Sequence, residues 1–347
     1  MNTKSPKSVS YDDVLLVPQY SDIRSRSDID ISIDLGKGLR LGLPVISSPM
    51  DTVSEAEMAV AMSAHGGVAI VHRYNTAEKQ ARMISIALEK NRDENMLIGA
   101  AIGITDDFLN RAAILKAIGT DFVCVDVAHG HHVLMEEALK TLRYKFGDDM
   151  HIMAGNVATL EGINDLADWG ADSVRCNIGG GSICSTRIQT GHGMPGLQTI
   201  FECAKTDRDV KIIADGGIKN SGDIVKALAA GADAVMCGSL FAGTNEAPGK
   251  VIEDKDGNRW KLYRGMASKE AQIGWRGKYS SHEGISTTIP YRGPVSKILE
   301  DIERGIRSGF SYSGAKDLAT LHAKAQFIEQ TTSGLSESRT HIVGRSW

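Results

Sequence analysis

The sequence predicts an α/β protein, a single (β/α)8 barrel that takes up residues 1–347. Eight short apolar runs alternate with stretches of helical periodicity, and most runs are near-continuous, which is typical of strands buried on both faces. Eight such units in roughly 250 residues match the size of this barrel. The pattern G-(A/T)-D-x-V also recurs at Gly119, Gly170 and Gly231, each time where a helix ends and a strand begins. Glycine suits that position because it accepts the left-handed conformation that often ends a helix.

The elements follow from these patterns in chain order. The predicted strands are 44–48, 67–71, 97–102, 122–126, 151–156, 173–178, 211–215 and 234–238. The clearest helical stretches are 54–64, 77–90, 107–118, 132–146, 160–169 and 222–230. A doubly wound open sheet is the rival architecture, but no G-x-G-x-x-G fingerprint follows the first strand.

The segment after the eighth strand is polar and long for a connector, from 243 to 294. Long loops of this kind are usually functional or disordered, so we expect a hairpin followed by an active-site flap at about 264–294. Helices at 294–307 and 316–329 are expected to close the domain, and the polar tail 331–347 is expected to be mobile.

Composition excludes several classes of protein. The chain has 39 Lys and Arg against 43 Asp and Glu, without a polybasic block, which argues against a nucleic-acid partner. No apolar run approaches the roughly 18–20 residues that span a bilayer, and the first residues lack a signal-peptide core. Five cysteines without a C-x-x-C pair indicate neither a disulfide scaffold nor a thiolate zinc site. We expect a soluble, cytoplasmic protein with no nucleic-acid or membrane partner.

The strongest chemical motif is GGGSICSTRIQTG at 179–191, directly after the sixth predicted strand. Glycines let the backbone approach a ligand closely, and a cysteine held in such a loop, here Cys184, is a candidate nucleophile. Thr186, two residues further on, could share a proton with the reacting centre. The structural alternative is a small buried cysteine, and the other four cysteines fit that interpretation. The glycine-rich strand end favours the catalytic interpretation for Cys184.

A second motif comes from two consecutive strand ends, Asp215-Gly216-Gly217 and Gly238-Ser239. Barrels commonly bind a phosphate after strands seven and eight, with backbone amides as donors. Either motif alone is as well explained by a tight turn, but together they predict a phosphorylated ligand. His129, His131 and His132 do not have the spacing of a metal site.

Several long motifs occur in order along the chain: YDDVLLVP at 11–18, SSPMDTV at 47–53, AGNVAT at 154–159, GGGSICSTR at 179–187, ADGGI at 214–218, CGSLFAG at 237–243 and YRGMAS at 263–268. By these motifs the chain resembles the IMP dehydrogenase/GMP reductase family nearly from end to end. The resemblance implies a (β/α)8 barrel, usually a homotetramer, that acts on a purine 5′-monophosphate with a nicotinamide cofactor.

The resemblance also implies roles for individual residues. Cys184 would attack C2 of the purine, with Thr186 and Glu283 as the other catalytic residues. The nucleotide would contact Ser48, Met50, Ser182, Asp215, Gly216, Gly217, Gly238, Ser239, Tyr263, Arg264, Gly265 and Met266. The cofactor would lie near Asp126, His129 and Gly130, and the carbonyls of Gly179, Gly181 and Cys184 would bind potassium (K+).

Two features favour one branch of the family. Dehydrogenases usually insert a pair of CBS domains after the second strand, whereas here one helix joins the second strand to the third. Dehydrogenases also use an Arg-Tyr pair in the flap to activate water, and none lies between Met266 and Glu283. The segment ending in Glu283-Gly284 is similar to the reductase flap, although Ser280 stands where many reductases have arginine, with Arg276 as a candidate substitute.

The expected activity is therefore the NADPH-dependent reductive deamination of GMP to IMP and ammonia, through a covalent purine intermediate on Cys184. The alternative within the family is an IMP dehydrogenase without CBS domains, which makes XMP with NAD. An alternative from another class is a catalytically inactive, nucleotide-binding regulator. The presence of Cys184, Thr186 and Glu283 argues against that regulator.

Overall fold

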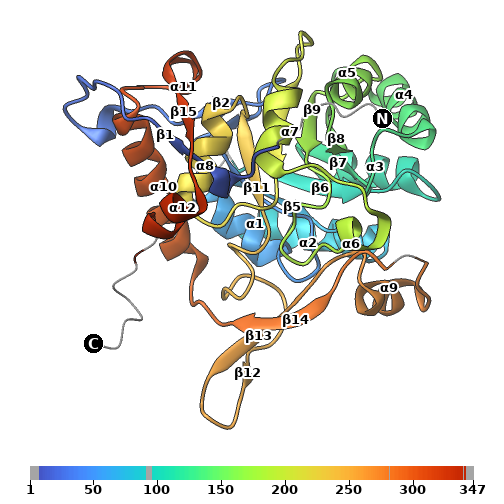
Figure 1. Cartoon of the computed structure of the whole chain (residues 1–347). Coiled ribbons are helices and arrows are strands. Elements are labelled where there is room, and N and C mark those ends of the chain that lie inside the picture. The colour runs from blue at the N-terminus through green and yellow to red at the C-terminus, as the bar shows by residue number, and fades with distance from the viewer. Residues whose placement is uncertain (1–7, 91–95, 281, 339, 341–347) are drawn as a thin grey trace.

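Eight parallel strands close into a barrel in the computed structural model, which describes residues 8–90, 96–280, 282–338 and 340 (Figure 1). The strands are β4 (Val45–Ser47), β5 (Val68–Val71), β6 (Ile98–Ile102), β7 (Phe122–Asp126), β8 (His151–Val157), β9 (Ser173–Cys176), β10 (Lys211–Asp215) and β11 (Ala234–Cys237). Each pairs with the next, and β11 pairs back with β4. The predicted (β/α)8 fold is confirmed.

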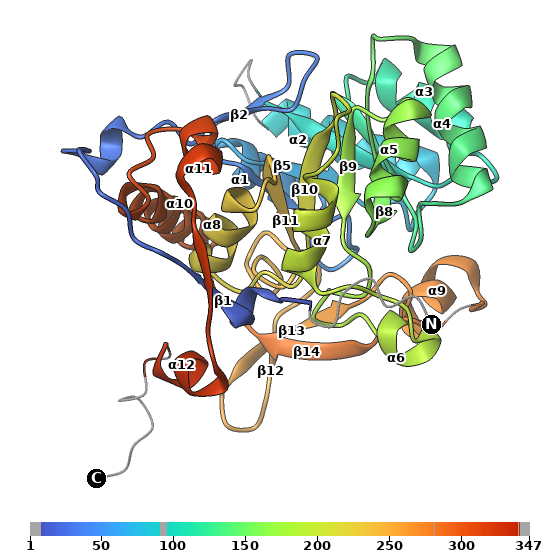
Figure 2. The ribbon, with the colours of Figure 1, turned by 45° about the horizontal axis from the view of Figure 1, so that its top comes forward.

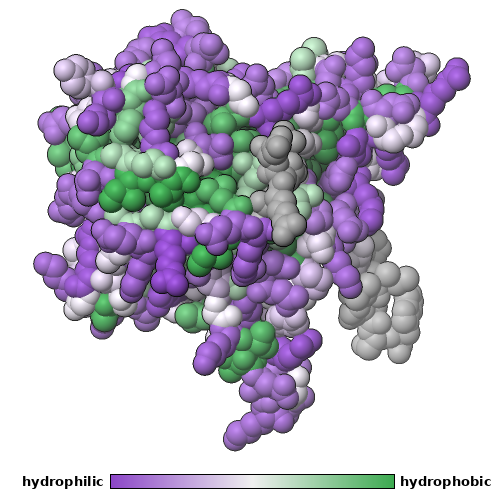
Figure 3. Space-filling model, turned by 180° about the vertical axis from the view of Figure 1, so that it is seen from behind, coloured by the Kyte–Doolittle hydropathy of each residue, from purple (hydrophilic) through white to green (hydrophobic). Residues whose placement is uncertain are grey.

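The helices cover the outside of this barrel, as Figure 2 shows from a second direction. They are α1 (Ala56–Ser63), α2 (Ala77–Lys90), α3 (Phe108–Ala117), α4 (Val133–Phe146), α5 (Leu160–Asp168), α7 (Gly196–Cys203), α8 (Ser221–Ala229) and α10 (Val295–Tyr312). Their buried side chains face the strands, and the face of the molecule seen in Figure 3 is largely hydrophilic with a band of hydrophobic side chains across it. In the described part of the chain, no helix combines the length and apolar character that a membrane crossing requires.

A hairpin closes the amino-terminal end of the barrel. Its strands are β2 (Ile33–Asp34) and β3 (Arg40–Leu41), and Ile33, Leu35, Leu39 and Leu41 are buried against the inward-facing side chains of the barrel strands. Lys37 at its turn pairs with Asp172, which precedes β9, with 3.1 Å between Nζ and Oδ1. Because this end is filled, the open mouth of the barrel lies at the carboxyl ends of the strands.

The repeated aspartates of the G-(A/T)-D-x-V pattern have a structural role. Asp121, Asp172 and Asp233 each accept the N–H of the first or second residue of the neighbouring strand at 2.7 Å, from Ile98, Ile152 and Ile212 respectively. Each carboxylate thus ties the start of its own strand to the start of the strand beside it. The repeat reports how the barrel is built, as its sequence context indicated.

The predicted second closing helix at 316–329 is wrong over its last third. Only α11 (Leu318–Lys324) is helical, and β15 (Phe327–Glu329) pairs antiparallel with β1 (Val14–Leu16). The strand's partner lies at the other end of the chain, so local periodicity contains no trace of it. In the predicted tail, α12 (Thr332–Glu337) is helical, and residues 339 and 341–347 lie outside the described residues. Mobility of the tail stays a prediction.

The long segment after β11 forms a three-stranded antiparallel sheet. Its strands are β12 (Ile252–Glu253), β13 (Arg259–Arg264) and β14 (Ser286–Pro290), and β12 and β13 form a hairpin. Helix α9 (Lys269–Arg276) connects β13 to β14, and we call residues 264–294 the flap. The sequence analysis did not identify α9 or the short α6 (Thr186–Thr190).

His151 is expected to make the folding stability depend on pH. Its side chain is buried, Nε2 lies 2.8 Å from Ser173 Oγ, and Nδ1 has no hydrogen-bond partner among the described residues. Burial lowers the pKa of His151 to about 4. Below pH ~6.5 the unfolded chain therefore binds a proton that the native chain excludes, so about 3 kcal/mol of stability should be lost as the pH falls to about 4.

Urea unfolding at several pH values checks this expectation. His151→Gln retains a hydrogen-bonding side chain but does not titrate, so its stability should fall less between pH 6.5 and 4 than that of the wild type. Equal losses in both proteins would show that His151 does not cause the dependence.

Candidate active site

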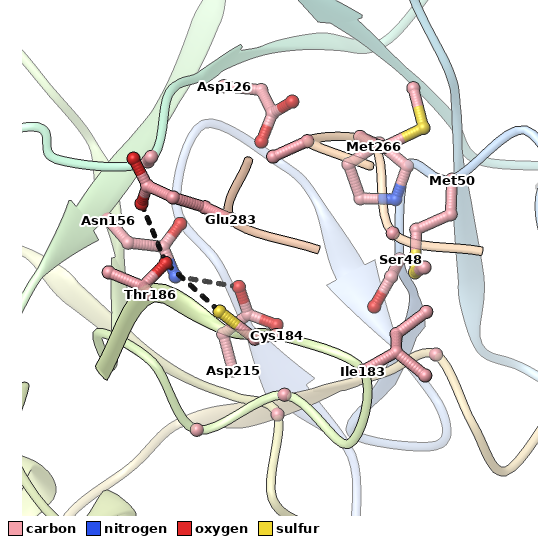
Figure 4. Close-up of a pocket in the computed structure, with 18 of the residues that line it drawn as sticks. Ser48, Met50, Asp126, Asn156, Ile183, Cys184, Thr186, Asp215, Met266 and Glu283 are labelled. Carbon is pink, nitrogen blue, oxygen red and sulfur yellow. Dashed lines mark hydrogen bonds between the residues drawn. The ribbon is translucent and has the colours of Figure 1, made fainter. Parts of the chain in front are cut away.

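The three predicted catalytic residues form one hydrogen-bonded chain at the mouth of the barrel (Figure 4). The Cys184 thiol donates to Thr186 Oγ1 at 3.2 Å, and the Thr186 hydroxyl donates to Glu283 Oε2 at 2.8 Å. Cys184 lies on the glycine-rich loop that follows β9, and Thr186 is the first residue of α6. The other four cysteines are buried, whereas Cys184 is partly exposed. A path for a proton therefore runs from the thiol to a carboxylate.

Backbone pairing brings Glu283 to this place across 97 residues of sequence. Residues 283–285 of the flap run antiparallel to residues 183–185 of the cysteine loop. Ser185 N donates to the Glu283 carbonyl at 3.0 Å, and Ile285 N donates to the Ile183 carbonyl at 3.1 Å. The carboxylate thus reaches Thr186 because the flap is paired with the loop that carries the cysteine.

A cavity of about 420 Å³ opens beside the thiol. All but one of the predicted nucleotide contacts line it: Ser48, Met50, Ser182, Asp215, Gly216, Gly217, Gly238, Ser239, Tyr263, Gly265 and Met266. They come from the end of β10, from the loops after β4, β9, β10 and β11, from β13 and from the flap. The mouth of the barrel therefore assembles these residues around a single space.

Glycine is needed where these loops approach one another. A Cβ at Gly238 would lie 3.0 Å from Met50 Sδ and 3.2 Å from the Tyr263 hydroxyl, and Gly216 has a φ of +81°. The Ser182 and Tyr263 hydroxyls lie 3.4 Å apart beside Gly238. Small residues and hydroxyls around exposed backbone suit a phosphate group.

Arg264, the remaining predicted nucleotide contact, does not line the cavity. Its Nε donates to Asp51 Oδ2 at 3.0 Å, so the guanidinium is held by the carboxylate that follows β4. Arg264 thus ties the flap to the barrel instead of facing the ligand space.

A buried arginine that the sequence analysis missed lies at the floor of the cavity. Arg175, on β9, donates from Nη1 to Asp126 Oδ1 at 2.6 Å and from Nη2 to Asp215 Oδ2 at 2.9 Å. Asn156 also donates to Asp215 Oδ2, at 2.8 Å. Burial alone would raise the pKa of Asp126, but the Arg175 and Arg73 guanidiniums outweigh it and hold that pKa below its usual range. The sequence does contain a signal for Arg175, because it is a charged residue inside a predicted buried strand.

Arg175→Met is expected to destabilise the protein more at neutral than at acidic pH. The variant leaves two partly buried carboxylates without the buried cation that they share, and breaking a buried ion pair costs about 3–5 kcal/mol. Burial would raise the pKa of Asp126 once Arg175 is gone, and protonation of Asp126 relieves part of that cost, so the loss measured by urea unfolding should be larger at pH 7.5 than at pH 5. Arg175→Lys keeps the charge and serves as the control, and an equal loss at both pH values would contradict the electrostatic explanation.

Of the three predicted cofactor contacts, only Asp126 lines the cavity. His129 is exposed, and Gly130 packs against the end of β8, where its N–H donates to the Asn156 carbonyl at 2.7 Å. His131 pairs with Asp165 at 2.7 Å, and His132 caps α4 through a bond from Leu134 N. Cofactor contacts by His129 and Gly130 stay predictions.

The predicted potassium ligands lie on one turn of the cysteine loop. Cys184 N donates to the Gly181 carbonyl at 3.1 Å, which brings these two residues together beside Gly179. Neutral backbone carbonyls suit a monovalent cation. Within residues 8–90, 96–280, 282–338 and 340, no cluster of three or more His, Cys, Asp or Glu side chains could hold a metal ion. The donor chemistry fits potassium, whose binding stays a prediction.

Fold and site together define a class of protein, a (β/α)8 barrel with a cysteine, a threonine and a carboxylate beside a cavity of about 420 Å³ at its mouth. The profile described as the IMP dehydrogenase / GMP reductase domain matches residues 8–341. The chain belongs to this family of oxidoreductases.

Similar proteins include both activities of the family. Inosine-5′-monophosphate dehydrogenase of Nitrosopumilus maritimus is 33% identical, over 97% of this chain and 98% of the relative. GMP reductase of Leishmania major is 30% identical, over 98% of each chain. The crystal structure of a cysteine-to-alanine variant of GMP reductase from Trypanosoma brucei, in complex with guanosine 5′-monophosphate, has a TM-score of 0.90 at 29% identity and covers 97% of this chain and 98% of its own.

Proposed function

We propose that this protein is a GMP reductase, which converts GMP, NADPH and a proton to IMP, ammonia and NADP+. The observation that carries the proposal is the hydrogen-bonded chain from Cys184 through Thr186 to Glu283. A reductive deamination needs a nucleophile for C2 of the purine and a proton for the leaving amine. These three hydrogen-bonded residues supply both.

The proton balance follows from the geometry. As Cys184 Sγ bonds to C2, the thiol proton passes through the Thr186 hydroxyl to Glu283. Glu283 returns a proton by the same route to the 2-amino group, so that the C2–N bond breaks and ammonia leaves. NADPH, when bound, supplies the hydride that replaces sulfur at C2 and releases the thiolate.

Different residues around the cavity are assigned to the phosphate, the ribose and the nicotinamide. The glycine loops after β9, β10 and β11 fit the phosphate, and Asp215 Oδ1 accepts no hydrogen bond from the described residues, so it is available for a ribose hydroxyl. Asp126 lies across the cavity from Cys184 in Figure 4, on the side that we assign to the nicotinamide. Potassium binding, a homotetramer and a cytoplasmic location complete the proposal.

The alternative is a CBS-less IMP dehydrogenase, and the similarity to dehydrogenases at 33% identity keeps it open. That reaction hydrolyses the covalent intermediate and needs an activated water. The flap has no adjacent Arg-Tyr pair between Met266 and Glu283 to provide one.

Assaying both reactions with both cofactors tests the proposal. We expect the purified protein to oxidise NADPH in a GMP-dependent manner with release of one ammonia per turnover. It should form no XMP from IMP and NAD+ at a comparable rate, because the flap sequence between Met266 and Glu283 has no Arg-Tyr pair to activate water. Robust XMP formation would replace the reductase with the dehydrogenase, and binding of GMP without either reaction would indicate the regulator.

A further inference from the structure

An aromatic cluster joins the flap to the barrel beside the cavity, away from the catalytic chain. Tyr74 follows β5, and Trp275 is in the last turn of α9; their rings are stacked with centroids 4.3 Å apart and an interplanar angle of 18°. The Arg276 guanidinium lies 3.9 Å from the centre of the Trp275 ring. Arg73 lies 5.6 Å from both ring centres. All four side chains line the cavity, and the proposed reaction uses none of them.

Both faces of the Trp275 ring are occupied. A stacked ring at 4.3 Å and a guanidinium at 3.9 Å cannot share one face, so Tyr74 covers one side and Arg276 the other. A planar ligand therefore finds no free face on Trp275. The ring holds protein to protein instead of serving as a platform for a ligand.

Besides the Arg264–Asp51 pair, two further contacts attach the flap to the barrel around the cavity. The inner attachment is the backbone pairing of residues 283–285 with residues 183–185, which positions Glu283. The outer attachment is the stack of Trp275 on Tyr74. Because the inner attachment consists of backbone hydrogen bonds, we expect Glu283 to stay at Thr186 when the outer stack is lost.

The outer attachment lies beside a different part of the cavity. Ser280 N donates to Gln272 Oε1 at 3.1 Å, so α9 and the residues after it are linked, and Gln272, Trp275 and Ser280 all line the cavity. On the barrel side, Arg73 Nη2 donates to the Asp126 carbonyl at 3.0 Å. The stack thus places α9 over the side of the cavity that holds Asp126, away from the glycine loops.

We propose that Trp275 is a positioning residue for the dinucleotide. Its stack on Tyr74 holds α9 as a roof over the Asp126 side of the cavity, and this roof sets the affinity for the dinucleotide but not for the mononucleotide. The inference rests on the proposed function to the extent that it takes a nicotinamide dinucleotide as the second ligand.

The test compares Trp275→Leu with Trp275→Phe. Leucine removes the stacking ring, and phenylalanine keeps it. Calorimetric titration with NADP+ and with NAD+ measures dinucleotide affinity without turnover, and titration with GMP measures mononucleotide affinity. Loss of one ring pair and its cation contacts should weaken dinucleotide binding and raise KM for NADPH roughly 10-fold in Trp275→Leu. Affinity for GMP should stay within about 2-fold, and Trp275→Phe should recover most of the loss.

A double-mutant cycle and a matched control sharpen the test. Tyr74→Leu should reproduce the effect, and the double variant should be no worse than either single one, because the same contact is removed. Trp260→Leu removes a tryptophan from β13, where its indole N–H donates to Asp254, outside the cavity lining; dinucleotide affinity should not change. Trypsin should cut after Arg276 faster in Trp275→Leu than in the wild type.

The outcomes separate this inference from the proposed function. Equal loss of GMP and dinucleotide affinity in Trp275→Leu, or no change in either, would overturn the positioning role. A protein that binds a dinucleotide through Trp275 but does not reduce GMP would keep the inference and reject the reductase. If Trp275→Leu does not fold, Tyr74→Leu with Tyr74→Phe as its control carries the same comparison.

Discussion

Cys184→Ala is expected to abolish turnover while GMP binding remains nearly unchanged. The thiol is the group that bonds to C2, and removing a nucleophile costs more than about 10⁴-fold in rate. The phosphate is held by other loops, around Gly216 and Gly238, so affinity for GMP should be retained. Steady-state assays with NADPH and calorimetric titration with GMP measure the two effects.

The matched control is Cys203→Ala, which changes a buried cysteine of α7 that does not line the cavity. This variant should keep its turnover at temperatures where it is folded. Measurable steady-state reduction of GMP by Cys184→Ala would exclude a covalent intermediate.

Glu283→Gln is expected to slow ammonia release by about 10²–10⁴-fold, the usual contribution of general acid–base catalysis. Glutamine can still accept the Thr186 hydroxyl bond of 2.8 Å, so the shape of the site is kept, but it cannot carry the thiol proton to the leaving amine. Affinity for GMP should change little, because Glu283 lies outside the glycine loops. Single-turnover measurement of ammonia release isolates this step from hydride transfer.

Glu270→Gln is the control, since Glu270 is an exposed carboxylate in the first turn of α9 on the same flap. This variant should release ammonia at nearly the wild-type rate. An unchanged rate of ammonia release in Glu283→Gln would remove Glu283 from the mechanism and weaken the reductase assignment.

The barrel strands could be predicted closely because their burial is a local property of the sequence. The strands at Phe122–Asp126 and Lys211–Asp215 have the predicted bounds, and the other six differ by one or two residues at one or both ends. A strand buried on both faces must be apolar along its whole length, so its neighbours in space need not be known. The flap helix α9 was missed because its polar sequence lacks that signal.

The cysteine loop could also be predicted from the sequence. A glycine triplet at the end of a strand favours close approach to a ligand over a purely structural role for the cysteine beside it. The role of Glu283 as its partner was predicted only from the family resemblance. No local pattern distinguishes Glu283 from a solvated carboxylate, and the backbone pairing that selects it joins segments about 100 residues apart.

By itself the sequence determined the barrel, the cysteine at its mouth and the family, because each depends on contiguous residues. The tertiary structure alone decided which side chains form ion pairs and ring contacts across the mouth of the barrel. Arg175 joins Asp126 to Asp215, Arg264 turns to Asp51, and Tyr74 stacks on Trp275. These choices depend on the distance and direction between side chains from different strands, and only closure of the barrel and docking of the flap define them.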